Sequence, residues 1–218
     1  LLAFTKDTLY SWSDRDDAWV SRGTHLAVKV DEETVFATAG DATDCDRAEL
    51  SDTIVYCWCD STFIFVGARD KNTGAILSGP TAVTGTRPRL VKLTTKILML
   101  YRDSGGILVA TALDPADVAT GVVAAPTTLL AAANFNLYYD VVRVGSTDTA
   151  IFACRRAVTT SYTIGTVTAA LVVATATPAR TCDGPISVSV PPTALTVQVL
   201  RGNGTAIQGD YITISGFV

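Results

Sequence analysis

The feature that most constrains the fold of this 218-residue chain is a loosely repeated module of strands. Each copy has an apolar strand, a short break, a very apolar strand, a glycine-bearing turn and a third strand. The copies occupy residues 49–74, 89–114, 141–167 and 186–209. Their middle strands begin near Ile54, Ile97, Ala150 and Leu195. This spacing matches the roughly 40–50 residues of a β-propeller blade, which contains four strands.

The middle strands of the repeat are apolar at consecutive positions, as in 97–100 and 151–154. An alternating strand has one face in solvent, whereas a strand apolar on both faces belongs to a sheet covered on both sides. We therefore predict an all-β fold, a β-propeller-like array of about four four-stranded antiparallel blades. The alternative is a tandem β-sandwich, which also has short strands and frequent turns.

Length and the first residue suggest the domain organisation. A chain of this length suffices for one large β domain, so residues 1–218 are predicted to form a single all-β domain. The chain begins at Leu1 and its only methionine is Met99, so we expect it to be part of a longer chain.

Runs of β-branched and aromatic residues between turn signals predict the individual strands. Two segments are expected to be helical instead: residues 44–50 (DCDRAEL) as one short turn, and residues 128–134 (TLLAAAN) as an alanine-rich helix. The predicted strands cover residues 24–30, 34–39, 53–59, 62–70, 89–94, 96–102, 106–114, 138–145, 148–155, 160–176, 185–190, 195–201 and 206–216.

Two tryptophans flank a charged tetrapeptide, residues 14–17, near the beginning of the chain. Its aspartates favour a turn because Asp side chains hydrogen-bond to their own backbone. A hairpin with this turn places Trp12 opposite Trp19, and facing aromatic residues stabilise such a hairpin by roughly 0.2–1 kcal/mol. The alternative is that an exposed indole forms a platform for a sugar ring.

The charge of the chain argues against a nucleic-acid partner, and its apolar pattern argues against a membrane span. The net charge is −4 with a pI near 4.9, and the 17 Lys and Arg residues are scattered. Sequence-specific binding to nucleic acid needs a basic patch, so it is not expected. The longest apolar stretch, residues 157–177, is rich in threonine and alternates, which predicts strands where a membrane span would need a continuous apolar helix.

The cysteines do not form a recognisable framework. An odd number at irregular spacing is unlike the disulfide pattern of a small secreted domain. A structural zinc site needs four converging ligands, and the only histidine, His25, has no partner nearby in the sequence. Free thiols in a β core are therefore expected, with folding in a reducing cytoplasm. The five cysteines are Cys45, Cys57, Cys59, Cys154 and Cys182.

Acidic residues cluster in one stretch, GDATDCDRAEL (40–50), which contains Asp41, Asp44, Asp46 and Glu49. Several carboxylates could bind Ca²⁺, although the spacing is not that of an EF-hand and the central glycine is missing. The other interpretation is a solvated turn that enters a short helix. No nucleophile, base and orienting group occur in a catalytic pattern, so we predict no enzyme activity, no cofactor and no metal.

Three segments resemble the propeller-bearing nozzle, or tail tubular, proteins of short-tailed bacteriophages. The segments are LLAFTKDTLYSWSDRDDAWVSRG, PTAVTGTRPRLVKLTTKILMLY and ILVATALDPADV, about a quarter of the chain. The resemblance implies a non-enzymatic structural component of the virion tail, folded in the host cytoplasm. It also implies a ring of identical copies beneath the adaptor, contacts with adaptor and fibres, and a DNA exit channel. Members of that family are far longer, so this chain would be part of one.

A second function class remains open, namely a carbohydrate-binding β-propeller module of a phage or bacterial surface protein. It requires aromatic side chains that stack on sugar rings and are exposed to solvent. The candidates are Trp12, Trp19, Trp58 and Tyr101.

Overall fold

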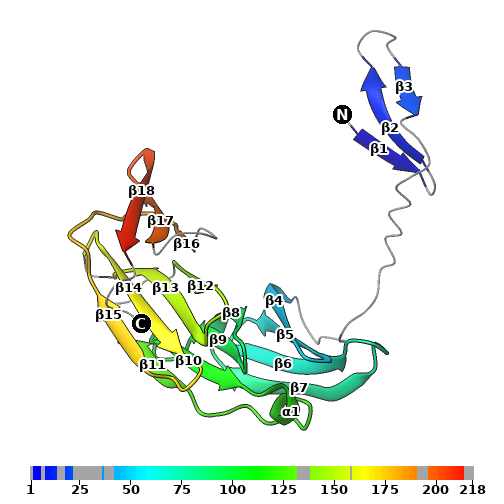
Figure 1. Cartoon of the computed structure of the whole chain (residues 1–218), viewed down its shortest axis with the longest axis horizontal. Coiled ribbons are helices and arrows are strands. Elements are labelled where there is room, and N and C mark those ends of the chain that lie inside the picture. Colours follow the sequence, from blue (N-terminus) through cyan, green and yellow to red (C-terminus); the bar gives the residue numbers. More distant parts are fainter. Residues whose placement is uncertain are drawn as a thin grey trace. The chain divides into compact units, whose positions relative to one another are not determined.

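The chain forms two compact units, Leu1–Ala37 and Thr38–Val218. Both units consist of antiparallel sheets (Figure 1). Among the described residues, no helix is long and apolar enough to cross a lipid bilayer. The computed structural model describes residues 2–5, 8–13, 18–21, 36, 42–131, 138–157, 159–190 and 196–213.

The first unit contains one three-stranded sheet of β1 (Leu2–Thr5), β2 (Thr8–Ser13) and β3 (Ala18–Ser21). Trp12 pairs with Trp19 across β2 and β3, so the predicted register of the hairpin is confirmed. The turn between them, residues 14–17, lies outside the described residues.

The second unit contains four successive antiparallel sheets, which we number as blades. Blade 1 comprises β4 (Thr43–Leu50), β5 (Thr53–Asp60), β6 (Phe63–Asp70) and β7 (Ile76–Thr84). Blade 2 comprises β8 (Thr86–Lys92), β9 (Ile97–Arg102), β10 (Leu108–Leu113) and β11 (Thr127–Leu130). Blade 3 comprises β12 (Tyr139–Arg143), β13 (Thr149–Arg155), β14 (Tyr162–Thr168) and β15 (Val173–Ala176). Blade 4 comprises β16 (Ile186–Ser189), β17 (Thr196–Asn203) and β18 (Ala206–Thr213).

The middle strands of blades 2 and 3, β9 and β13, each contribute to two cores, because their alternate side chains face different neighbouring blades. Ile97 and Met99 of β9 pack with blade 1, whereas Leu98 and Leu100 pack with blade 3. A third core joins blades 3 and 4. Blades 2 and 3 are therefore covered on both faces. This is the packing of a propeller, and it excludes the tandem β-sandwich.

The first strand of each blade lies next to the first strand of the following blade, in the order β4, β8, β12 and β16. Successive strands of each blade then follow outward in a simple meander (Figure 1). The fold is thus the predicted β-propeller-like array, with first strands that line its inner side.

Two helix predictions were wrong where the structure describes the segments. Residues 44–50 and residues 128–130 lie in strands, and residues 132–134 lie outside the described residues. Residues 43–50 form β4, whose exposed polar positions face the inner side of the array, so the segment lacks an apolar strand pattern. Residues 127–130 form β11, because pairing with β10 overrides the helix propensity of its two leucines. The strands predicted at residues 24–30 and 34–39 lie outside the described residues, except for Phe36.

Three elements were not predicted. The first is strand β1, which pairs with β2 ahead of the expected hairpin. Strand β7 completes blade 1 as its outermost strand, and its largely exposed positions give a weak strand signal. A short helix, α1 (Pro115–Val118), follows β10, with Asp114 as its N-cap and Pro115 at its start. Both signals are typical of a helix N-terminus.

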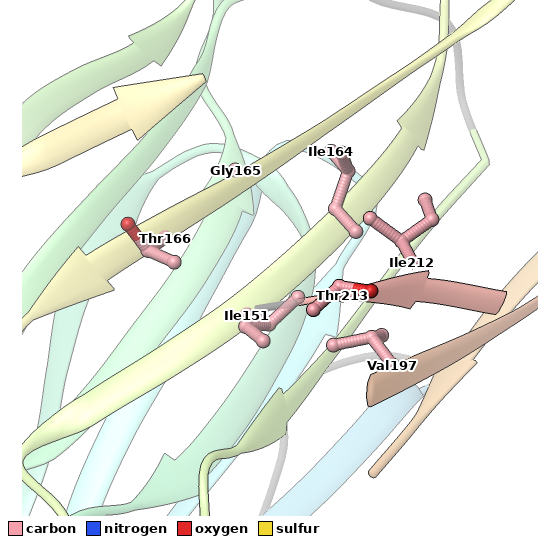
Figure 2. Close-up of a pocket in the computed structure, with 7 residues that line it drawn as sticks. All are labelled: Ile151, Ile164, Gly165, Thr166, Val197, Ile212 and Thr213. Atoms are coloured by element: carbon pink, nitrogen blue, oxygen red, sulfur yellow. The ribbon is translucent and has the colours of Figure 1, made fainter. Parts of the chain in front are cut away.

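The interface of blades 3 and 4 encloses a small cavity of about 10 Å³. Its walls are mostly apolar, with Ile151, Ile164, Val197 and Ile212 pointing toward one another (Figure 2). A water molecule needs at least this volume and several polar partners. The cavity is therefore a packing gap and not a ligand site.

Gly165 of β14 is required by close packing between strands. A Cβ atom at this position would lie 2.5 Å from Cζ of Phe152 and 2.7 Å from the Ala174 carbonyl oxygen. We expect Gly165→Ala to lower the free energy of unfolding by about 1–3 kcal/mol, because the core must shift to accept the methyl group. Urea denaturation followed by circular dichroism would measure this loss. Gly79→Ala is the control, since its Cβ would meet nothing within 4 Å, and equal losses in the two variants would refute the packing argument.

Candidate functional site

The aromatic residues proposed to stack on sugars are not available where the structure describes them. Trp58 is 6% exposed and stacks on Phe65, with ring centroids 5.7 Å apart. Tyr101 is 3% exposed and belongs to the core between blades 1 and 2. Neither ring offers a face to a ligand. The side chains of Trp12 and Trp19 lie outside the described part of the chain.

The acidic stretch does not gather into a metal site within the described residues. Asp46 accepts a hydrogen bond from the Leu90 backbone amide at 2.7 Å, and Glu49 forms an ion pair with Lys71 at 2.9 Å. Their carboxylates are thus engaged with protein groups. Asp41 lies outside the described residues.

The cysteines are free thiols, and four of the five are buried as expected. Cys45 is the exception, because it lies exposed on the inner strand β4. Burial raises the pKa of the Cys154 thiol to about 12, and it also raises the pKa of Cys57. Since the thiolate is the reactive form, these buried thiols are inert near neutral pH.

The most distinctive feature of the inner strands is a pair of β-bulges at matching positions. The pairing register shifts between Thr43 and Asp46 in β4, and between Thr86 and Arg89 in β8. Directly after each threonine, the backbone turns to positive φ, 47° at Asp44 and 57° at Arg87. Positive φ is costly for non-glycine residues, and bulges of this kind re-aim side chains, often near functional sites.

Both re-aimed residues line one pocket of about 100 Å³, which we call the axial pocket. Its walls come from the first strands of all four blades and from the residue before β12. Residues far apart in the sequence therefore converge where the inner strands meet. The lining residues are Asp44, Arg87, Arg89, Tyr138, Tyr139 and Ile186.

Tyr139 fixes the position of Arg87. Its hydroxyl group donates toward two backbone carbonyls of blade 2, that of Leu100 at 3.0 Å and that of Arg87. Burial raises the pKa of this hydroxyl well above its usual range, so it stays protonated and remains a donor. The strained backbone at Arg87 is thus held from blade 3.

Tyr138 lies at the edge of the axial pocket and is 38% exposed. The guanidinium group of Arg155 lies over its ring, 6.0 Å from the centroid. The Arg155 amide also donates to the Tyr138 carbonyl at 3.0 Å. A cation–π contact and a backbone hydrogen bond together hold this partly exposed aromatic ring in place.

Three aspartates tie neighbouring blades together through main-chain amides. Asp46 of blade 1 binds the Leu90 amide of blade 2. Asp148, just before β13, accepts from two amides of blade 2, those of Thr94 at 2.7 Å and Thr95 at 3.0 Å. Asp140 of blade 3 binds the amide of Val188 in blade 4 at 2.9 Å. Every interface between adjacent blades therefore has one such carboxylate contact.

Of the residues that line the axial pocket, only Asp44 was singled out from the sequence, as a possible Ca²⁺ ligand. The sequence did contain a signal. The motifs TDCD (43–46) and TRPR (86–89) each stand at the beginning of the first strand of a blade. Their shared threonine and equal spacing match the two bulges. The aromatic pair Tyr138-Tyr139 lies at the corresponding beginning of β12.

Comparison with known proteins gives structural neighbours only. No family model and no curated protein matches the chain. Among solved structures, the Dos1 propeller matches 89% of the chain at 11% identity with a TM-score of 0.49. A protein of Bacteroides ovatus assigned as a dipeptidyl aminopeptidase IV matches 97% of the chain at 9% identity, also with a TM-score of 0.49.

The chain spans 48% of the first of these structures and 31% of the second. At this level of likeness neither neighbour bears on function. The sheet topology itself establishes a β-propeller-like fold.

Proposed function

We propose that this chain is a non-enzymatic structural module that acts by assembly with other protein chains. The observation that carries this proposal is an apolar sheet face on blade 4 that no described strand covers. Leu200, Ile207 and Tyr211 lie on it, and the last two are 81% and 71% exposed. Exposed apolar patches of this kind mark protein interaction sites.

Strand pairing places these residues on one face. Gly202 pairs with Ile207, Leu200 with Gly209, and Gln198 with Tyr211, and directly paired residues point to the same side of a sheet. The opposite face holds Val197 and Val199 in the core with blade 3. Next to the exposed residues, a groove of about 490 Å³ runs along β16, β17 and β18. Blades 2 and 3 have both faces covered, so we infer that this face also packs against protein.

In its specific form, the proposal is a nozzle component of a short-tailed bacteriophage. Copies of the chain assemble into a ring beneath the adaptor, contact other tail proteins, and surround the channel through which DNA leaves. The sequence resemblance to nozzle proteins and the propeller-like fold support this assignment. The negative net charge suits a lumen that DNA must pass without being held.

Immunogold electron microscopy of particles purified from the source lysate tests the assignment directly. Antibody against this chain should label the tail just below the head. Label at the distal tips would replace the nozzle with a receptor-binding role. Particles without label would refute a place in the virion.

Self-association provides a biochemical prediction. We expect the chain to associate with itself through the exposed face of blade 4, and Ile207→Lys to weaken this association by about tenfold or more, because it places a charge in an apolar contact. Sedimentation velocity over a range of concentrations measures the effect. Val172→Lys is the matched control, since Val172 is also exposed and apolar but lies outside blade 4. A chain that stays monomeric, or equal effects of both variants, would contradict the prediction.

A further inference from the structure

Positive residues outnumber acidic ones among the described residues that line the axial pocket. These include two arginines, Arg87 and Arg89, and one aspartate, Asp44. The next carboxylate along the inner strands on each side, Asp46 and Asp140, is already bonded to main-chain amides. These two acids therefore satisfy protein donors, and the arginines outnumber the acid within the pocket itself.

The form of the pocket suits a small oxyanion. A guanidinium group presents N–H donors in a planar fork that matches a carboxylate or phosphate group. A volume of about 100 Å³ admits one such group with few further atoms. The left-handed backbone at Arg87, held by Tyr139, means that a strained conformation is kept at the residue that would contact the anion.

A second observation concerns Arg155, which contacts Tyr138 of the same pocket. The Nε atom of Arg155 is buried and has no hydrogen-bond partner among the described residues. Its guanidinium group lies over the ring of Tyr138, which lines the pocket and is partly exposed. A buried, unused donor is costly and usually has a partner in the functional state. The edge thus combines a third cation with an aromatic ring.

We propose that the axial pocket binds a small ligand that bears an oxyanion, a carboxylate or a phosphate group, held by Arg87 and Arg89. Tyr138 contacts the rest of the ligand. The two residues that would hold the anion, Arg87 and Arg89, belong to blade 2 and not to blade 4, so the inference does not depend on the proposed assembly function. Either of the two can fail without the other.

Isothermal titration calorimetry of the whole chain tests this binding at constant ionic strength. Sodium D-glucuronate and inorganic phosphate are the anionic probes, and D-glucose is the neutral control with the same sugar ring. We expect saturable binding of at least one anion and none of glucose. Glucuronate alone would identify a carboxylate ligand, phosphate alone a phosphate ligand, and both would show a general oxyanion site.

Variants tie the binding to the pocket. Arg89→Gln should weaken the affinity for the anion by at least about tenfold, because it removes a charged donor. Asp44→Asn should strengthen it, because it removes a repelling charge from the same wall. Arg47→Gln is the matched control, since Arg47 lies on the same inner strand but does not line the pocket. Circular dichroism checks that each variant is folded.

The two charge changes have opposite expected signs, which a general loss of structure could not produce. If Arg89→Gln does not fold, the gain of affinity in Asp44→Asn decides the matter alone. Dissociation constants above about 10 mM for both anions would overturn the proposal. Equal binding of glucose and glucuronate, or an unchanged affinity in both pocket variants, would also overturn it.

Discussion

Phe152→Ala is expected to lower the free energy of unfolding of the propeller unit by about 3–5 kcal/mol. The side chain of Phe152 is fully buried in the core between blades 2 and 3. Its ring also lies against Gly165 of the next strand, where no Cβ fills the space. Alanine would remove this large apolar group and leave a cavity that two rigid sheets cannot close. Urea denaturation followed by circular dichroism measures the loss.

Two controls make the Phe152 result specific. Phe152→Leu keeps most of the volume and should cost less than the alanine variant. Leu200→Ala removes an apolar side chain from the exposed face of blade 4 and should change stability by no more than about 0.5 kcal/mol in the monomer. A loss below about 1 kcal/mol for Phe152→Ala would mean that blades 2 and 3 do not share the core described here.

The second large effect concerns an ion pair within blade 4. Arg201 is 5% exposed, and its Nε atom donates to Oδ2 of Asp210 at 2.7 Å. Asp210 also accepts a hydrogen bond from the hydroxyl of Tyr162 at 2.9 Å, which links it to blade 3. Asp210→Ala should lower the free energy of unfolding by about 3–5 kcal/mol, because it leaves a buried guanidinium without its carboxylate. Urea denaturation at neutral pH checks this value.

Comparison variants separate the ion pair from simple packing. Tyr162→Phe removes one hydrogen bond and should cost about 1 kcal/mol. The double variant Arg201→Met with Asp210→Leu removes both charges and should cost less than Asp210→Ala alone. A double variant that is the less stable of the two would show that the charges are not the source of the effect.

The same pair predicts a dependence of stability on pH. The hydrogen bond from Arg201 holds the pKa of Asp210 below its usual range. A carboxyl with a lowered folded-state pKa contributes stability that is present above its unfolded pKa of about 3.9 and is lost as pH falls through the folded value. The stability difference between the wild-type chain and Asp210→Ala should therefore shrink on acidification below about pH 4. Thermal unfolding of both chains at pH 6 and pH 3 measures it, and a constant difference would contradict the assignment.

The fold could be read from the sequence where burial on both faces left its mark. Residues 97–100 are apolar at each position because β9 lies between two other blades, and this pattern with its spacing predicted the propeller. The inner strand β4 carries no such mark. Its polar residues face the inside of the array, so the same segment was expected to be helical. The outer strand β7 and the inner strand β4 lack a continuous apolar pattern for the same reason, since neither strand is covered on both faces.

The candidate site could not be read in the same way. The axial pocket brings together Asp44 and Ile186, which are separated by most of the propeller unit. Its geometry depends on two bulges, and a bulge leaves little trace in a pattern of apolar and polar residues. Trp58 shows the opposite problem, because an aromatic residue in a strand has the same sequence context whether its ring is buried or exposed.

The aspartate contacts between blades have a consequence for how such a chain can vary. The carboxylates of Asp46, Asp140 and Asp148 accept hydrogen bonds from main-chain N–H groups of the neighbouring blade. Every residue except proline has a main-chain N–H group, so the hydrogen bond can form whatever side chains the neighbouring strand carries. Leu90 or Val188 can therefore be exchanged freely as far as this contact is concerned. A blade that arose by duplication or recombination would therefore present the main-chain donor that the neighbouring aspartate binds. The side chains of the inner strands could then change to bind new ligands without loss of this contact.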